Sequence, residues 1–377
     1  MTDWAALRKL FPVTERCVYL DNGSLSPLAL PVFDAMNRFL QYRRDIGRDF
    51  ASWWETADRV RGKLADWIGA DASEICFTDS TTRGVNLIAR GLQWQKGDNV
   101  ILCEGEFPSN LYPWLNLQKD GVELRFLPGT RMTPELLEAS ADSRTRLVAV
   151  SQVQATDGYR CNLSAISRFC REKDIRLLVD GTQSLGAVPL DVRELEGIDF
   201  LCAAAYKWLL GPDGLGFVYV RKTRLKDLSF SDLGWSGRTD RNDFTSRELD
   251  YPQAARRFEL GNLNYSALHG LEAALDLLGS VGVEEIFQRD RKLAARLKEL
   301  LHSVPGLRLN SPEAPEETGF LINFDVPKRE KVHRALAEKG FLTGLKANGI
   351  RACPNFFNTE EELEHFVQAL REVEAAL

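Results

Sequence analysis

The sequence predicts an α/β protein whose large domain is a mainly parallel, seven-stranded sheet covered by helices on both faces. Two observations support this fold class. Short apolar runs alternate with stretches of helical periodicity over residues 74–221, an alternation that is typical of parallel sheets. After about residue 260 helical patterns dominate, which indicates a smaller α+β domain. We place the large domain at 20–260 and form the small domain from 1–19 and 261–377.

Seven short apolar runs are the expected strands of the large sheet. In chain order they span 74–79, 99–104, 122–127, 146–152, 175–180, 199–205 and 216–221. Helical periodicity between the strands predicts helices over 81–94 and 163–174. Ligands of such sheets bind beyond the carboxyl ends of the strands, so that edge is where site residues are expected.

The C-terminal part of the chain is mostly helical in pattern. Helices are expected over 264–278, 283–303, 329–339 and 358–377, with short strands at 319–326 and 349–354 between them. The last helix begins with an Asn-Thr cap followed by acidic residues, which are favoured at a helix N-terminus.

Composition narrows the function classes. The chain has 377 residues, a net charge of −6 with both signs spread along it, and seven cysteines without a C-x-x-C pair. These features predict no nucleic-acid partner, no membrane partner, and reduced thiols rather than a disulfide framework. No apolar run is long enough to span a bilayer, and the first residues lack the zones of a secretory signal. We therefore expect a cytoplasmic protein.

Histidine is scarce, with only four in the chain. Neither an H-E-x-x-H sequence nor a Cys/His cluster is present, so no metal site is predicted. A G-x-S-x-G elbow is also absent, which argues against a Ser-His-Asp hydrolase.

Two strand ends carry residues that suit a phosphorylated ligand, although each has a simpler interpretation. Asp180 ends an apolar strand in "VDGTQS", with Gln183 three residues on; a plain Asp-Gly turn would give the same sequence. Thr81 and Thr82 begin a helix directly after a strand. Such a helix start can bind an anion, and it can equally be an N-cap.

Lys207 lies between two apolar strands, in "AAAYKWLLGPDGLG". A lysine in apolar surroundings tends to lose its proton and become a nucleophilic amine, whereas one at a strand end can also extend to solvent. The glycines that follow open a strand rather than a helix, so they are not a dinucleotide-binding fingerprint. That argues against a nicotinamide-dependent oxidoreductase.

Together these groups are the set that pyridoxal phosphate needs. Its aldehyde needs an amine, its pyridine nitrogen needs an acid, and its phosphate needs fixed donors. Lys207, Asp180 and the pair Thr81 and Thr82 supply one of each. The sequence therefore predicts pyridoxal 5'-phosphate as cofactor.

From "YLDNGS" (19–24) to "FFNTEEEL" (356–363), the chain resembles the class V aminotransferase group of fold-type-I pyridoxal-phosphate enzymes. Cysteine desulfurases, selenocysteine lyase, isopenicillin N epimerase and several C–S lyases belong to this group. The resemblance implies that Lys207 is the Schiff-base lysine and that Asp180 pairs with the pyridinium nitrogen. It also implies that Gln183 binds the phenolic oxygen of the coenzyme.

The resemblance assigns several further residues. Thr81 and Thr82 match the pair that holds the phosphate, and Tyr206, in place of a frequent histidine, is expected to donate to the same group. Asn262 matches a position that reaches the phosphate of the partner subunit, which implies a homodimer with shared active sites. Arg351 matches the arginine that grips the substrate α-carboxylate.

Two departures from the family pattern bear on the reaction. Phe107 stands where the family often has a histidine stacked on the coenzyme; it can stack but cannot move protons, so more acid–base work falls to Lys207. Desulfurases carry a persulfide-forming cysteine on a loop before the arginine, and "LTGLKANGI" contains none. Cys353 follows Arg351 by two residues, so on a strand both share a face and bordering the pocket is one alternative; we expect Cys353 to be a packed residue instead.

Gln152 and Asn355 are further pocket candidates, Gln152 as a substrate-binding residue. A packing or turn role is an equal alternative for both.

The resemblance implies an enzyme that acts on an α-amino acid through a Schiff base at Lys207 and a quinonoid intermediate. Without the loop cysteine, we rank β-elimination by a C–S lyase and transamination first, ahead of epimerisation and cysteine desulfuration. The non-enzyme alternative is a silent binding protein on the same fold. Loss of Lys207 or Asp180 would mark such a protein, and both residues are present.

Overall fold

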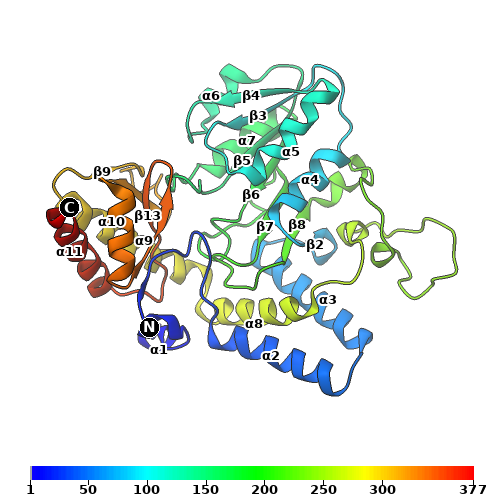
Figure 1. Cartoon of the computed structure of the whole chain (residues 1–377). Coiled ribbons are helices and arrows are strands. Elements are labelled where there is room, and N and C mark those ends of the chain that lie inside the picture. The colour runs from blue at the N-terminus through cyan, green and yellow to red at the C-terminus, as the bar shows by residue number, and fades with distance from the viewer. Residues whose placement is uncertain (1) are drawn as a thin grey trace.

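The computed structural model describes residues 2–377. Within these residues a seven-stranded sheet forms the centre of the larger part of the molecule, with the order β2-β8-β7-β6-β5-β3-β4 (Figure 1). Its strands are β2 (Ile75–Thr78), β3 (Asn99–Cys103), β4 (Glu123–Leu127), β5 (Thr145–Ser151), β6 (Arg176–Asp180), β7 (Ile198–Ala204) and β8 (Gly216–Val220). All seven predicted strands are present, and the α/β fold class is confirmed.

The sheet is mixed rather than wholly parallel. Strand β8 runs antiparallel to both its neighbours, β2 and β7, while the other neighbouring strands pair in parallel. The cause is the short connection 205–215 between β7 and β8, because a parallel crossover needs about a dozen residues or more. The prediction of a mainly parallel sheet is therefore confirmed only in part.

Helices cover both faces of this sheet. On one face α4 (Thr81–Gly91) and α5 (Tyr112–Leu115) pack on apolar side chains of the central strands. The other face is covered by α2 (Leu30–Asp45), α3 (Phe50–Ile68), α7 (Leu163–Glu172) and α8 (Tyr265–Val281). A short helix, α6 (Pro134–Ser140), packs near α7 and β4. Alternate residues of each central strand enter the two cores, as expected for a doubly covered sheet.

Helices α2 and α3 were not predicted from the sequence. In α3 the buried side chains Trp53, Val60, Leu64 and Ile68 follow helical spacing. Helix α8 packs against both helices and is seen beside α2 in Figure 1. The predicted domain boundary at residue 260 placed α8 in the small domain, whereas α8 packs with the large sheet. The domain boundaries stay a prediction.

A second sheet, ordered β12-β13-β10-β9, lies at the other end of the molecule (Figure 1). Its strands are β9 (Arg308–Leu309), β10 (Ile322–Asp325), β12 (Gly344–Lys346) and β13 (Gly349–Ala352). Helices α9 (Val283–His302), α10 (Arg329–Glu338) and α11 (Glu360–Ala376) share an apolar core with it. Thr359 caps α11 in a capping box with Glu362, in agreement with the predicted helix start.

The N-terminal segment joins this second body. Strand β1 (Val18–Tyr19) pairs in parallel with β11 (Phe341–Leu342), and α1 (Trp4–Arg8) lies nearby (Figure 1). The segment then leads into α2, so residues 18–30 run between the two sheets. This connection brings the turn 21–24 next to the larger sheet.

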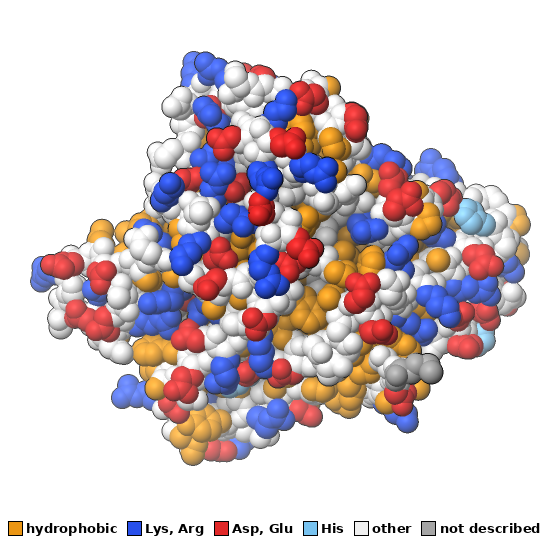
Figure 2. All heavy atoms as spheres, turned by 180° about the vertical axis from the view of Figure 1, so that it is seen from behind, with side chains coloured by type: hydrophobic (Ala, Val, Ile, Leu, Met, Phe, Trp, Pro, Cys, Tyr) orange, Lys and Arg blue, Asp and Glu red, His pale blue; other side chains and the backbone are white. Residues whose placement is uncertain are grey.

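On the face shown in Figure 2, lysine and arginine side chains are interspersed with aspartate and glutamate. The seven cysteines are free, and all but Cys17 are buried. Within residues 2–377, no helix is both long enough and apolar enough to cross a membrane. Across the same residues, no group of three or more His, Cys, Asp or Glu side chains is placed to hold a metal ion.

Candidate active site

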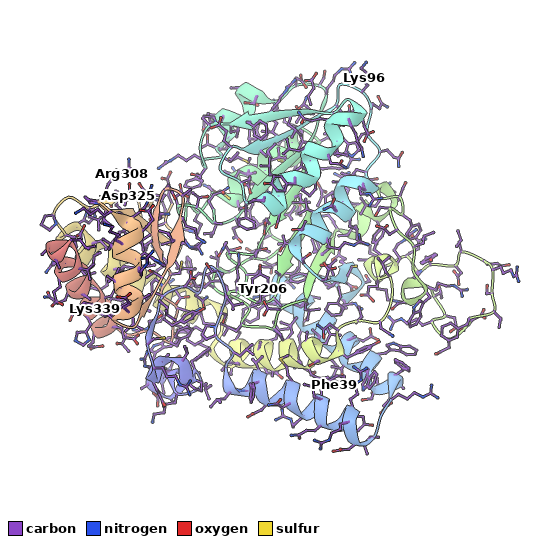
Figure 3. All side chains as sticks on the ribbon, viewed as in Figure 1. Phe39, Lys96, Tyr206, Arg308, Asp325 and Lys339 are labelled. Atoms are coloured by element: carbon purple, nitrogen blue, oxygen red, sulfur yellow. The ribbon has the colours of Figure 1, made fainter. Side chains whose placement is uncertain are left out.

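A small cavity lies at the carboxyl ends of β5, β6 and β7, the edge where ligands of α/β sheets bind. Figure 3 shows Tyr206, one of its lining residues, at the centre of the molecule above α8. Six predicted site residues line the cavity: Thr81, Phe107, Asp180, Gln183, Tyr206 and Lys207. Segments far apart in the sequence meet there because each follows a strand at the same edge of the sheet.

The backbone around Lys207 is fixed by a compact turn. The Leu210 N–H donates to the Lys207 carbonyl at 3.0 Å, and the Gly211 N–H donates to the Ala205 carbonyl at 2.9 Å. Leu210 adopts φ +57°, a left-handed conformation that costs a non-glycine residue free energy. Such outliers persist where the surrounding structure imposes them, and this one lies in the turn that begins at Lys207.

The Lys207 side chain points inward, and only 6% of the residue is exposed. Its Nζ atom lies 5.4 Å from the ring centroid of Phe107 and 5.7 Å from that of Tyr206. Burial lowers the pKa of Lys207 to about 8, an effect that the Asp180 charge opposes and the Arg351 charge reinforces. The lysine is therefore a buried amine that is partly neutral near pH 8, and the solvent-extended alternative is wrong.

Asp180, the last residue of β6, is buried on the wall of the same cavity. Burial raises the pKa of its carboxyl, while the Thr182 hydrogen bond and the Lys207 charge oppose the rise. The Thr182 N–H donates to Oδ1 at 2.9 Å, so the Asp-Gly turn interpretation holds as well. The carboxylate closes a turn and still presents an acid to the cavity.

The start of α4 forms one side of the cavity. The N-cap is Ser80, whose hydroxyl accepts from the Arg83 N–H, so the cap alternative for Thr81 and Thr82 is wrong. Thr81 lines the cavity, and its Oγ1 is 2.7 Å from that of Thr182. Thr82 is exposed and donates instead to the Ser109 hydroxyl at 2.8 Å. A helix start with hydroxyls around it favours a phosphate.

Gln183 is held by two hydrogen bonds. Its Nε2 donates to the Gly23 carbonyl at 2.8 Å, and its Oε1 accepts from the Trp208 indole at 3.0 Å. Because Nε2 carries a second hydrogen, the side chain can still donate to an oxygen in the cavity. Trp208, the neighbour of Lys207, thus fixes the orientation of this amide.

Phe107 is backed by a buried carboxylate that the sequence analysis missed. Glu106 accepts hydrogen bonds from the Ser151 N–H (2.9 Å) and hydroxyl (2.6 Å), Asn110 Nδ2 (3.0 Å) and Gln154 Nε2 (2.7 Å). Burial raises the pKa of Glu106, and these hydrogen bonds oppose the rise. The cluster fixes the loop that carries Phe107. Phe107 lines the cavity wall and is itself 46% exposed. The local signal was a carboxylate directly before the aromatic residue in "CEGEFPSN".

Arg351 approaches the cavity from β13 and is only 2% exposed. Its Nη1 donates to the carbonyl of Ala155, a lining residue, at 2.7 Å. Its Nη2 donates to the Ser24 hydroxyl at 2.9 Å and lies 3.6 Å from Asp21 Oδ1. Nε is buried without a hydrogen-bond partner. The guanidinium therefore keeps N–H groups available for a carboxylate.

Two predicted residues, Asn262 and Gln152, do not line this cavity. Asn262 lines a different cavity, together with Asp79 and Arg83. Gln152 is buried between Ser151 and Val153, which line the Lys207 cavity while Gln152 itself does not; alternation along the strand explains this. The roles predicted for Asn262 and Gln152 stay predictions.

Asn355 accepts from the Phe356 N–H at 2.7 Å, which supports its turn interpretation.

Cys353 is a packed residue, as expected. It has no exposed surface, and burial raises the pKa of its thiol, although the Arg351 charge opposes this. A Cβ added at Gly23 would lie 2.8 Å from its sulfur, which shows how closely the turn 21–24 covers it. A buried thiol with a raised pKa is a poor nucleophile.

The residues present fit pyridoxal phosphate. One cavity combines an amine of lowered pKa (Lys207), a buried carboxylate (Asp180), a helix start with a hydroxyl (Thr81) and an aromatic ring (Phe107). These groups match the aldehyde, the ring nitrogen, the phosphate and the ring face of this coenzyme.

Known proteins match this chain over nearly its whole length. The family model Aminotransferase class-V matches residues 18–364. A probable cysteine desulfurase from Methanothermobacter thermautotrophicus is 30% identical over 394 residues, which cover 97% of this chain and 97% of the relative.

Solved structures agree over the same length. The apo cysteine desulfurase of Thermococcus onnurineus NA1 has a TM-score of 0.91 and 26% identity, and the match covers 100% of this chain and 99% of that one. The cystine C–S lyase C-DES, in complex with its reaction product cysteine persulfide, has a TM-score of 0.89 and 26% identity over 96% of this chain and 99% of its own. A C-DES variant with glycine covalently linked to its PLP cofactor has a TM-score of 0.91 and 26% identity, covering 99% and 100%.

Proposed function

The chain belongs to the class-V aminotransferase family of pyridoxal-phosphate enzymes, and from this premise we propose that it is a C–S lyase. In this reaction an S-substituted cysteine and water give a thiol, pyruvate and ammonium. One observation carries the proposal: the site has a buried base but no reactive thiol. Lys207 is the base, and Cys353, the thiol beside Arg351, is buried and has a raised pKa. A persulfide route needs a reactive thiolate, whereas β-elimination needs only the base.

The substrate is held by this chain's own residues. Arg351 has N–H groups to spare and would bind the α-carboxylate through a charge-assisted pair. Thr81 and the start of α4 would hold the coenzyme phosphate, with Phe107 against one face of its ring. Asp180 would balance the charge on the ring nitrogen. When bound, pyridoxal phosphate supplies an electron sink for negative charge at the substrate Cα.

Lys207 then moves the protons. Its neutral Nζ takes the proton from Cα, and the electron pair of that C–H bond leads to cleavage of the Cβ–S bond. The protonated Nζ returns a proton to the departing sulfur, which leaves as a thiol. A base with a pKa of about 8 suits both steps, because it can accept and release a proton near neutral pH. Phe107 cannot share this work, since its side chain has no titratable group.

We also propose a homodimer and a cytoplasmic location. The homodimer is supported by Asn262, which lies outside the Lys207 cavity of its own chain and matches a position that reaches the partner's phosphate. Light scattering should give twice the 42.5 kDa chain mass; a monomeric and fully active enzyme would contradict the shared site. The cytoplasmic location is supported by seven free cysteines.

Cysteine desulfuration is the second candidate, because the relatives named above include cysteine desulfurases. It would transfer the sulfur of cysteine to an acceptor thiol and leave alanine. The segment 342–350 provides no cysteine for this transfer, so the acceptor would have to be a thiol supplied from solution.

One product analysis separates the reactions. The holoenzyme is incubated with S-methylcysteine and with cysteine in deuterated water, and pyruvate, thiol, alanine and sulfide are measured. Equal amounts of pyruvate and methanethiol from S-methylcysteine are expected for the lyase. Alanine from cysteine, with sulfide that is released only when a reducing thiol such as dithiothreitol is added and with S-methylcysteine untouched, would replace the lyase by a desulfurase. A keto acid that keeps its sulfur, formed with aminated coenzyme, would indicate transamination, and an unconsumed amino acid with deuterium at Cα would indicate epimerisation.

A further inference from the structure

A second cation, Lys346, lies beside the proposed carboxylate arginine. Strands β12 and β13 form a hairpin in which Gly344 pairs with Arg351 and Lys346 pairs with Gly349. Residues two positions apart on a strand share a face, so Lys346 and Arg351 are diagonal neighbours on one face of the hairpin. That face contacts the turn 21–24.

Gly344 leaves room for the lysine. A Cβ added at Gly344 would lie 3.4 Å from Lys346 Cε and 2.8 Å from Asp21 Oδ1. The aliphatic part of the Lys346 side chain therefore lies next to the space that a side chain at position 344 would fill. This brings Lys346 Nζ to 3.5 Å from the Ser24 hydroxyl, the same oxygen that accepts from Arg351 Nη2 at 2.9 Å.

Positive charge exceeds negative charge at this place. The nearby carboxylate is that of Asp21, which lies 3.6 Å from Arg351 and whose Oδ1 is buried without a hydrogen-bond partner. The contact of Lys346 is the neutral Ser24 hydroxyl. Burial lowers the pKa of Lys346, and the Arg351 charge lowers it further, while Asp21 opposes both. Asp21 offsets one of the two positive charges, and a further anion would offset the other.

The arginine alone satisfies one carboxylate. A guanidinium fork binds a carboxylate through two parallel N–H groups, and Arg351 has its Nε and further N–H hydrogens available. Lys346 is thus an additional cation rather than part of that fork. The charge of Lys346 also reaches Lys207, whose pKa it lowers after the larger effects of burial, Asp180 and Arg351. Geometry places Lys346 at the carboxylate site, because Lys346 and Arg351 contact the same Ser24 hydroxyl.

We propose that Lys346 and Arg351 form a subsite for two anionic groups, and that the preferred substrates are α-amino acids whose side chain ends in a second carboxylate. Arg351 binds the α-carboxylate, and Lys346 binds the acid at the far end of the sulfur-linked substituent. This proposal rests on the proposed function for the role of Arg351 and for the sulfur-linked substituent. Lys346 is then a specificity-determining residue that the sequence analysis did not identify.

A matched pair of substrates tests the subsite. S-carboxymethylcysteine and its neutral amide, S-carbamoylmethylcysteine, have nearly the same shape and differ by one charge. Dissociation constants are measured from the absorbance change of the bound coenzyme, and kcat/KM from pyruvate release. The wild-type holoenzyme should bind the acid at least about tenfold more tightly than the amide, the effect of one charge-assisted hydrogen bond. Equal affinities would overturn the proposal.

Two lysine variants complete the experiment. Lys346→Met keeps the length of the side chain and should abolish the preference for the acid while changing the affinity for the amide little. Lys339→Met is the control: Lys339 is exposed, contacts Glu372 at 3.5 Å, and lies on the outer side of the second sheet, away from Tyr206 in Figure 3. It should keep the wild-type preference. A Lys346→Met enzyme that retains the preference would contradict the subsite.

The two proposals fail in different ways. If neither compound yields pyruvate but the acid still binds more tightly in a Lys346-dependent manner, the lyase reaction is wrong and the subsite stands. If both compounds yield pyruvate with equal kcat/KM and equal affinity, the lyase stands and the subsite is wrong.

Discussion

The side-chain nitrogen of Lys207 lies over the ring of Phe107, 5.4 Å from its centroid. This relationship places a buried amine and an aromatic face on the same small cavity, which Asp180 and Thr81 also line. A flat ligand against Phe107 would have its edge within reach of the amine. The predictions below follow from how each of these groups is held.

The first prediction concerns pH. Because burial lowers the pKa of Lys207 to about 8 and only the neutral amine attacks an aldehyde, pyridoxal phosphate should attach to the coenzyme-free protein faster as pH rises, with the rate levelling off above that value. Stopped-flow absorbance measures this rate. The Asp180 charge opposes the lowering, so in Asp180→Asn the midpoint should move to lower pH. A midpoint near the ordinary value of 10.5 would contradict the buried amine.

Asp180→Asn should also lower the turnover of the enzyme and its affinity for the coenzyme. The substitution keeps the turn-forming oxygen but removes the charge opposite the ring nitrogen, so kcat should fall by roughly a hundredfold or more, as for loss of one preorganised electrostatic group. Coenzyme affinity should fall as well, since a charge-assisted bond is replaced by a neutral one. Steady-state kinetics and coenzyme titration measure both effects. Asp174→Asn, at a carboxylate whose side chain is 94% exposed, is the control and should match wild type.

Glu106→Gln tests the support behind Phe107. An amide cannot accept all four hydrogen bonds of Glu106, so one or two buried donors lose their partner, at a cost of about 1–3 kcal/mol in the free energy of unfolding. Coenzyme affinity should decrease with it, because the loop that carries Phe107 loosens.

Urea unfolding and coenzyme titration provide the two readouts for Glu106. Glu104→Gln, at an exposed carboxylate that accepts from the Gly129 N–H at 3.1 Å, should change neither by a comparable amount. If Glu106→Gln were as stable as wild type and bound coenzyme equally well, the supporting role of Glu106 would be refuted.

Cys353→Ala should leave the cleavage of S-methylcysteine nearly unchanged. The thiol is buried, its pKa is raised, and β-elimination uses Lys207 instead. Pyruvate release is the measurement, and thermal unfolding checks that the packed site tolerates the smaller side chain. Loss of sulfur release in a variant that still folds and still exchanges the Cα proton would assign Cys353 a role in sulfur transfer.

The sequence was sufficient to predict which strand ends meet at one cavity. Lys207 and Thr81 follow predicted strands and Asp180 ends one, and the carboxyl ends of parallel strands lie at one edge of the sheet. The antiparallel β8 was also within reach of the sequence, because 205–215 is short for a parallel crossover. Helices α2 and α3 were missed although the buried positions of α3 keep helical spacing.

Other features depend on contacts that no local pattern contains. Ser24 lies 327 residues from Arg351, yet their side chains share a hydrogen bond of 2.9 Å. The position of Lys346 beside Arg351 depends on the register of the hairpin, which makes the two residues diagonal neighbours. Likewise, no local pattern distinguishes Glu106 from other carboxylates. Its donors Ser151 and Gln154 come from another strand and the loop that follows it. Long-range packing, rather than spacing, assembles this part of the site.

The central claim, that Lys207 carries the coenzyme, is tested most directly by reduction of the holoenzyme with borohydride, followed by digestion and mass spectrometry. We predict a single pyridoxyl adduct on the peptide that contains Lys207, and its loss in Lys207→Ala. An adduct on another lysine, or none in a holoenzyme that shows full activity, would contradict this account.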